Sequence, residues 1–312
     1  MKKSVLVIGP QWNAQWTESV CRGLQANGCT PHLVYYTEPL SASWKTLRRW
    51  VPRWIKTSVK LWHWPDREAK LIDIAASLRP DFILVLKGEL FFPYTIRALQ
   101  ACTHGPVVLW SVDDPEATAL QRQCLPLFDK VFVHKPLAPY TYLPCAGDSL
   151  LYSRVPTLDF LPYTKRLAFI GTAYPERKRV IDAMTVPLHL SGTGWWPRRA
   201  APEMPPSNAA AAYAQTYINL NIHHHGGGPN TRTFEIPLAG GFQLCDAVAG
   251  ISDLLEPDKE IALYTSPEHC REQVARYLHD PTTRRTILDR GHQRCLAEHT
   301  YTHRMKTLLE AL

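Results

Sequence analysis

The 312-residue sequence contains no long apolar run. No stretch approaches the roughly 20 apolar residues that cross a bilayer as a helix. The beginning of the chain resembles a signal peptide only briefly, because its apolar run is limited to Val5 to Ile8 and Gly9-Pro10 ends it. We therefore expect this run to form the first buried strand of a folded domain, not a leader.

The eight cysteines are scattered, and they lack the spacing that a zinc site or a redox motif needs. There is no C-x-x-C and no ligand-like His/Cys pattern. This predicts reduced thiols in a cytoplasmic protein, with neither a disulfide framework nor a structural metal. The fingerprint G-x-G-x-x-G is also missing after the first strand, where Gly9 to Asn13 reads GPQWN. No dinucleotide site is predicted there.

The chain is basic, with a formal net charge of +7, which favours an anionic partner. Residues 44–64 contain six Lys or Arg, five Trp and no acidic residue. Trp and basic side chains together suit a lipid headgroup region or an acceptor, and Trp50 and Arg53 are the candidates for such contacts. The alternatives are an amphipathic helix packed on its own domain and a stacking surface for nucleic acid.

The order of expected elements indicates two α/β domains. In the first half, the short apolar runs expected as strands are Ser4–Gly9, His32–Tyr36, Phe82–Leu86, Val107–Trp110 and Asp129–His134. A Pro-rich passage, 135–162, precedes a second series of strands and helices that begins at Leu167–Gly171. We expect domains at 1–150 and 163–299, followed by a terminal helix at about 300–312.

Residues 217–246 are the strongest candidate for a ligand-binding unit. They are expected to form a strand, a glycine loop at Gly226–Gly228, a helix with Asn230 as N-cap, the closing pair Gly240-Gly241 and a second strand. Ligands of α/β proteins bind at the strand ends of such units, and a helix N-terminus favours phosphate. A plain helix–sheet connection is the alternative.

Charged side chains near two expected helix starts also indicate a binding site for an anion. Arg232 offers a bidentate donor to an anion, and Glu235, one turn later, offers a carboxylate that suits two ribose hydroxyls. A further helix opens after the strand that ends in Gly171, and its first turn contains Arg177 and Lys178. Cations at a helix start oppose the helix dipole, so they indicate either a bound phosphate or a solvated helix face.

Carboxylates at strand ends are candidates for catalysis. Asp113 and Asp114 follow one expected strand, and Glu89 follows another. Chemistry in α/β proteins takes place at the carboxyl ends of parallel strands, but only one of two adjacent residues faces a ligand there. Asp113 and Asp114 are alternatively caps of a helix that begins near Glu116.

Together these residues resemble the spore-maturation CgeB-like glycosyltransferases, a GT-B group with a glycosyl transferase-like C-terminal half. The matching segments, from about residue 80 onward, are Trp110–Pro115, Phe169–Gly171 with Glu176-Arg177, Leu220–His223, Asn230–Asp246, Asp258–Glu260 with Tyr264, and His299–Arg304. The resemblance implies two Rossmann-like domains facing a cleft, with the last helix crossing back to the N-domain. It also implies transfer of a sugar from a nucleotide-sugar donor without a metal, because basic groups and helix N-termini stabilise the leaving diphosphate.

By this resemblance the donor lies mainly on the C-terminal domain. Glu235 would hold the ribose hydroxyls, Arg177 with Lys178 would contact the diphosphate, and the loop at Gly171 would allow a close approach. The other donor-side candidates are Asn230 and Arg232 for the phosphate or sugar, and Gly192 and Trp195 for the base.

On the acceptor side, the candidates are Asn13, Trp50 and Arg53. One departure from the family pattern is that Gly226–Gly228 stands where many retaining relatives carry a second glutamate. An inverting enzyme would use Asp113, Asp114 or Glu89 as its general base, and a retaining one would use the leaving phosphate, so the stereochemistry stays open. Nucleotide-sugar hydrolysis or epimerisation, a non-catalytic binding or assembly protein, and a nucleic-acid-binding protein are the rival functions.

Overall fold

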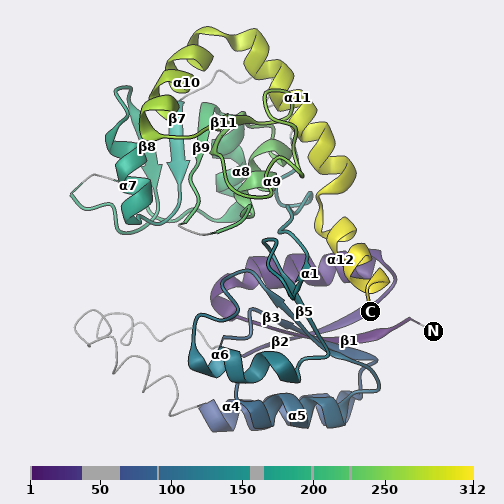
Figure 1. Cartoon of the computed structure of the whole chain (residues 1–312). Coiled ribbons are helices and arrows are strands. Elements are labelled where there is room, and N and C mark those ends of the chain that lie inside the picture. The colour runs from purple at the N-terminus through teal and green to yellow at the C-terminus, as the bar shows by residue number, and fades with distance from the viewer. Residues whose placement is uncertain (1, 37–63, 90, 155–164, 198–199, 225–226) are drawn as a thin grey trace. The chain divides into compact units, whose positions relative to one another are not determined.

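The computed structural model describes the chain in six segments, which are residues 2–36, 64–89, 91–154, 165–197, 200–224 and 227–312. These residues divide into two compact units (Figure 1). Unit one comprises Met1–Val133, Leu137–Leu143 and Met305–Leu312, and unit two comprises His134–Pro136 and Pro144–Arg304. Each unit is built on one parallel sheet, so the predicted α/β class is confirmed.

The sheet of unit one has six strands in the order β2-β1-β3-β4-β5-β6, all of them parallel. The strands are β1 (Ser4–Gly9), β2 (Thr30–Tyr35), β3 (Phe82–Leu86), β4 (Val107–Ser111), β5 (Lys130–Val133) and β6 (Thr141–Tyr142). Every residue of β3 and β4 is buried, as expected for parallel strands that are covered on both faces. Helix α1 (Ala14–Ala26) covers one face, and α4 (Trp64–Leu78) and α5 (Pro93–Cys102) cover the other (Figure 1).

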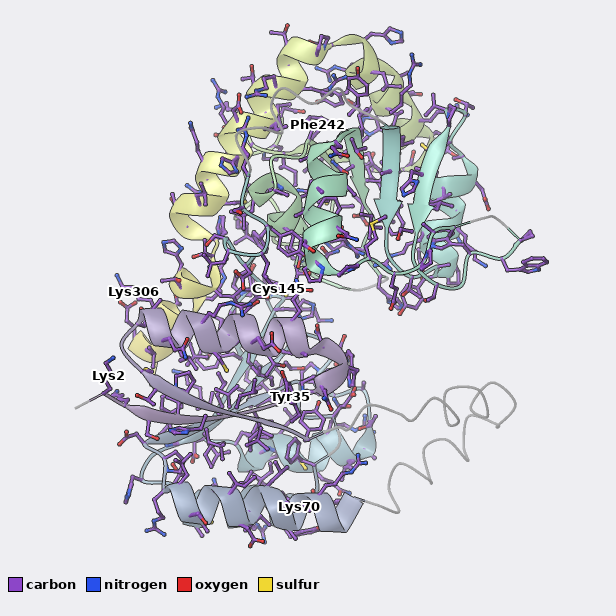
Figure 2. The ribbon with its side chains drawn as sticks, turned by 180° about the vertical axis from the view of Figure 1, so that it is seen from behind. Lys2, Tyr35, Lys70, Cys145, Phe242 and Lys306 are labelled. Carbon is purple, nitrogen blue, oxygen red and sulfur yellow. The ribbon has the colours of Figure 1, made fainter. Side chains whose placement is uncertain are left out.

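The sheet of unit two has five parallel strands in the order β11-β10-β9-β7-β8. The strands are β7 (Lys165–Ile170), β8 (Leu188–Ser191), β9 (Thr216–Asn221), β10 (Gln243–Asp246) and β11 (Ala262–Tyr264). The helices are α7 (Pro175–Asp182), α8 (Pro206–Ala214), α9 (Arg232–Leu238), α10 (Pro267–His279) and α11 (Pro281–Glu298). Helix α10 packs on α7 and the sheet, and α9 packs with α8 and α11. The ring of Phe242, labelled in Figure 2, lies 4.9 Å from the ring of Tyr277 in α10.

The terminal helix α12 (Tyr301–Glu310) begins in unit two and ends in unit one. Its last part is therefore built into the N-terminal unit, as the fold class implies. The predicted boundary between residues 150 and 163 overlaps residues 155–164, which lie outside the described residues, so that boundary stays a prediction.

The expected strands and helices are present with small shifts at their ends, and two features differ. The helix expected near Glu116 is α6 (Ala119–Cys124), which starts later because the Thr118 side chain caps it by accepting from the Gln121 N–H at 3.1 Å. The Pro-rich passage was expected to be only a connection, but it contains the short strand β6.

All eight cysteines are free thiols, and all of them are buried. Among the helices that the structure describes, none combines the length and the apolar character needed to cross a membrane.

Candidate functional site

The loops at the carboxyl edge of the sheet in unit two approach each other closely at two glycines. A Cβ atom on Gly192, after β8, would lie 2.4 Å from the carbonyl oxygen of Gly171, after β7. A Cβ atom on Gly171 would in turn lie 2.5 Å from Nη1 of Arg232. Glycine at position 192 therefore lets the two loops pack together, and glycine at position 171 lets Arg232 of α9 reach the end of β7.

Arg177 of α7 is buried at this edge. Its guanidinium donates to the carbonyl oxygens of Ile222 at 2.9 Å and Thr172 at 2.8 Å, and it lies 5.4 Å from the ring centre of Phe169. Burial, together with the positive charge of Arg232, lowers the pKa of Arg177 to about 10. The side chain is thus fixed by backbone carbonyls at a site where its charge is costly.

Arg232 approaches the same aromatic ring. Its guanidinium carbon lies 5.6 Å from the centre of Phe169, Nη1 donates to the Ile170 carbonyl at 2.9 Å, and Nε donates to Asn221 at 3.4 Å. Among the described residues, no carboxylate pairs with Arg232 or Arg177. Two guanidiniums that are held close together, with no carboxylate of the described residues within ion-pair distance, form an arrangement that binds an anion.

Glu235 lies one turn into α9 and is half-buried. It accepts hydrogen bonds from the side chains of Thr231 and Tyr152. Burial raises the pKa of Glu235 to about 7, although Arg232 opposes that shift. Hydroxyl donors from a ligand would favour the charged carboxylate and so draw this pKa back down.

His223 ties both ends of the glycine loop that follows β9. Its Nδ1 lies 2.6 Å from Asp246 Oδ1, and its backbone N–H donates to Asp246 Oδ2 at 3.0 Å. Its Nε2 accepts the backbone N–H of Asn230 at 3.1 Å, which assigns the imidazole proton to Nδ1. Asn230 in turn donates to Asn221 at 3.0 Å and accepts the N–H of Thr233 at 3.3 Å. The sequence predicted Asn230 as the N-cap of this helix, but the N-cap residue of α9 is Thr231.

A metal site at this cluster is not supported by its chemistry. His223, Cys245 and Asp246 offer ligand atoms within 4.8 Å of one another. Both nitrogens of His223 are engaged in hydrogen bonds, however, with Asp246 at Nδ1 and with the backbone N–H of Asn230 at Nε2, so the imidazole offers no free nitrogen to a metal. The three side chains therefore form a hydrogen-bonded cluster that positions the loop, and sequence spacing alone did not identify it.

Two other donor-side candidates, Trp195 and Lys178, lie beside Gly171 and Arg177. Trp195 is only 3% exposed, its Nε1 donates to the Gly171 carbonyl at 2.9 Å and its ring packs edge-on against Phe169, so it holds the loop from within the core. Its neighbour Trp196 is 85% exposed. Lys178 lies next to Arg177 on α7 and is partly exposed.

The glycine loop itself is described from Gly227 onward, and Gly226 lies outside the described residues. Gly228 donates its N–H to Nε2 of His134 at 3.4 Å, and a Cβ atom there would lie 2.8 Å from the Cβ of Lys135. Glycine at this position therefore allows the loop to lie directly on the chain segment that enters unit two.

In unit one, two of the predicted catalytic carboxylates lie together. The Lys87 ammonium lies 2.7 Å from Asp113 and 3.6 Å from Glu89. Asp114 instead accepts the backbone N–H of Glu116 at 3.0 Å, so it closes a turn outside this group. Asp113 and Asp114 thus have different partners in the structure, although the sequence alone did not distinguish their roles.

Of the three acceptor-side candidates, the structure describes only Asn13. Asn13 is partly buried at the start of α1, where its carbonyl accepts from the Thr17 hydroxyl. Trp50, Arg53 and residues 37–63 in general lie outside the described residues. The membrane, acceptor and nucleic-acid interpretations of the basic segment therefore stay predictions.

Residues 169–310 match the model of a family described as glycosyl transferase-like. This segment contains every candidate donor contact named above. No curated protein shows significant sequence similarity to the chain.

Solved structures with the same fold cover nearly the whole chain. Sucrose-phosphate synthase from Thermosynechococcus elongatus is similar with a TM-score of 0.70 and 14% identity over 99% of both chains. Anabaena Alr3699/HepE in complex with UDP-glucose has a TM-score of 0.68 and 12% identity, over 99% of this chain and 100% of that one. A glycosyltransferase from Rickettsia africae ESF-5 has a TM-score of 0.68 and 9% identity, over 99% and 97%. At these identities the comparisons establish the fold, two Rossmann-like domains of the GT-B class, and the CgeB-like subgroup stays a prediction.

Proposed function

We propose that the protein is a glycosyltransferase that moves a sugar from a nucleotide-diphosphate sugar to an acceptor. The observation that carries the proposal is the group formed by Arg177, Arg232 and Glu235 at the carboxyl edge of unit two. All three lie in the segment that matches the glycosyl transferase-like family. We also propose that the protein belongs to the CgeB-like group, because the sequence motifs around these residues resemble it.

In this proposal the two arginines bind the diphosphate. Charge develops on the leaving diphosphate as the bond to the sugar breaks, and donors that are already fixed in place stabilise it without reorganisation. Arg177 is held by two backbone carbonyls and Arg232 by a third, so both meet that requirement. Lys178 adds a positive charge beside them. The proposed reaction therefore uses no metal ion and no cofactor in addition to its two substrates, the donor and the acceptor.

Glu235 would accept hydrogen bonds from the two ribose hydroxyls of the donor. The first donor to test is UDP-glucose, because the similar Anabaena protein is described in complex with it. For the acceptor we propose Asp113 as the general base of an inverting reaction, in preference to Asp114, whose carboxylate is engaged in a turn. The eight free thiols suit a reducing compartment such as the cytoplasm.

The test is a thermal-shift and calorimetric screen of UDP, GDP, ADP, dTDP and CMP, and of their sugars, on wild type and Glu235→Ala. A ligand at 100 times its dissociation constant adds about 2.7 kcal/mol of stability to the folded state. We expect one nucleotide series to stabilise the wild type, and Glu235→Ala to lose that effect.

Glu256→Ala is the matched control, since Glu256 is an exposed glutamate of the same unit that forms an ion pair with exposed Lys259. It should keep the full response. If no nucleotide raises the melting temperature of the wild type, or if Glu235→Ala responds as the wild type does, the proposed donor site is wrong.

A further inference from the structure

Unit one carries a group of side chains that the donor site does not use. Trp12, Lys87, Glu89 and Asp113, here called the strand-edge cluster, follow β1, β3 and β4. These three strands are neighbours in the sheet and run parallel, so their carboxyl ends lie side by side. The cluster therefore occupies the edge of unit one at which α/β domains bind ligands.

Trp12 is the exposed part of the cluster. It lies in the 3-10 turn η1 (Gln11–Asn13) between β1 and α1, and its side chain is 57% exposed. The turn is short because α1 approaches β1 closely: a Cβ atom on Gly9 would lie 2.4 Å from the Thr17 methyl group. The Lys87 ammonium lies 3.9 Å from the centre of the indole. The indole is thus fixed by a cation on one face while most of its surface remains open.

The Lys87 ammonium is fully engaged within the cluster. It contacts the indole of Trp12 and both carboxylates, with distances of 2.7 Å to Asp113 and 3.6 Å to Glu89. The backbone supports this placement, because Lys87 and Gly88 both have a positive φ, at 71° and 65°. A β-carbon on Gly88 would lie 2.6 Å from the Leu109 side chain, so the turn is closely packed against β4.

The charges of the cluster select the kind of ligand. One ammonium faces two carboxylates, which leaves one net negative charge beside the open indole. A phosphate group would be repelled there, because the only cation of the cluster is already paired. Carboxylates accept hydrogen bonds and never donate them when ionised, so they suit hydroxyl groups. An uncharged sugar ring offers those hydroxyls at its rim and an apolar face of C–H groups for the indole.

We propose that the strand-edge cluster is the acceptor site and that the acceptor is an uncharged saccharide. Its ring stacks on Trp12, and its hydroxyls bind Asp113 and Glu89. Lys87 is a positioning residue that holds the indole and the carboxylates in register. The role of this site in transfer rests on the proposed function, whereas saccharide binding by the cluster does not.

The experiment measures UDP release from UDP-glucose, or from whichever donor the nucleotide screen identifies, with two panels of added acceptors. One panel contains neutral methyl glycosides and neutral oligosaccharides, and the other contains glucose 6-phosphate and fructose 6-phosphate. We expect at least one neutral saccharide to accelerate UDP release about tenfold over donor hydrolysis, and the sugar phosphates to have no effect.

Trp12→Ala should then raise the KM for that saccharide at least tenfold, change kcat less, and leave the donor dissociation constant unchanged. Trp12→Phe should keep most of the affinity, because it keeps an aromatic face. Ile74→Ala removes an exposed apolar side chain from α4 of the same unit and should behave as wild type. An unchanged melting temperature of Trp12→Ala shows that the variant is folded, as expected for an exposed side chain.

Three results overturn the inference while donor binding is intact. They are a saccharide KM unchanged in Trp12→Ala, a preference for sugar phosphates over neutral sugars, and no effect of any neutral saccharide on UDP release. Failure of the wild type to bind any nucleotide sugar contradicts the proposed function instead, so the two failures are distinguishable.

Discussion

The sharpest quantitative prediction concerns Glu235→Gln and the dependence of stability on pH. Burial raises the pKa of this carboxyl from 4.5 to about 7 in the folded protein. Between these two values the folded state binds a proton that the unfolded state has released. The free energy of unfolding therefore falls as the pH rises through this window, and the group contributes its full stability only below the unfolded pKa. Glutamine is neutral at every pH and removes this dependence.

The magnitude follows from the two pKa values. Each pH unit that separates the folded from the unfolded pKa is worth about 1.4 kcal/mol. The rise from 4.5 to about 7 thus sets a ceiling of about 3 kcal/mol. Between pH 5 and pH 8 we expect a loss of about 2 kcal/mol, because the side chain is half-buried and solvent screens part of the effect. For a unit of this size that corresponds to a fall in melting temperature of about 5 °C.

The assay is urea and thermal unfolding of the wild type, Glu235→Gln and the exposed control Glu256→Gln at pH 5, 6, 7 and 8. Glu235→Gln should equal the wild type at pH 5 and exceed its stability at pH 8. A saturating nucleotide should reverse the order at pH 8, because it stabilises only the protein that can accept its ribose hydroxyls.

Parallel curves for the wild type and Glu235→Gln across the pH range would refute the reasoning, since they would mean that the carboxyl titrates alike in the folded and unfolded chains. A glutamine variant that is less stable than the wild type at pH 8 would contradict it as well. In that case the hydrogen bond from Tyr152 stabilises the charged carboxylate by more than burial destabilises it.

Three further predictions concern the loops of unit two. Gly171→Ala places a Cβ 2.5 Å from Nη1 of Arg232, so it should displace this guanidinium and weaken nucleotide binding about tenfold in calorimetry, or about 1.4 kcal/mol. Asp246→Ala leaves two N–H groups of His223 without their acceptor and should cost about 2 kcal/mol in urea unfolding. Gly192→Ala meets the Gly171 carbonyl oxygen at 2.4 Å with φ at +123°, and should destabilise unit two by about 2 to 3 kcal/mol in thermal unfolding.

These variants have internal controls. Gly28→Ala also has a positive φ, +80°, but its Cβ would meet nothing within 4 Å, so it should cost only about 1 kcal/mol. Equal costs for the substitutions at Gly192 and Gly28 would disprove the steric argument. Nucleotide affinity that Gly171→Ala leaves unchanged would remove Arg232 from the anion site. An Asp246→Ala variant as stable as the wild type would show that water replaces the carboxylate.

Much of the fold was predictable from the sequence because its signals are local. Short apolar runs separated by Gly and Pro indicated the parallel strands, and the hydrogen bond of Asn230 at the start of α9 needs only a side-chain oxygen three residues before the N–H that it accepts. Helix α9 stops after Leu238, and the stop needs only a residue such as Gly240 that adopts a φ of +79° just beyond the helix. Such signals do not depend on what the rest of the chain does.

The site was less predictable because tertiary contacts decide between residues that look alike locally. Trp195 and Trp196 are neighbours of the same type, and the ring of Phe169 on β7 determines which of them enters the core. Asp113 and Asp114 are separated by the position of Lys87, which comes from a different strand end. No short-range pattern contains this information.

The site in unit two and the strand-edge cluster in unit one carry opposite charges, and this difference suggests how the protein keeps its two substrates apart. The site in unit two presents two guanidiniums without a carboxylate partner among the described residues, an environment that costs energy until an anion arrives. The strand-edge cluster of unit one has its single ammonium engaged by Asp113 and Glu89, and it keeps a net negative charge. In the arrangement that we propose, a diphosphate donor is attracted to the first environment and repelled by the second, whereas an uncharged acceptor meets no penalty at the second. Charge alone would then keep the donor out of the acceptor site and the acceptor out of the donor site. A phosphorylated acceptor would lose this separation, because its phosphate would compete with the donor for the two arginines.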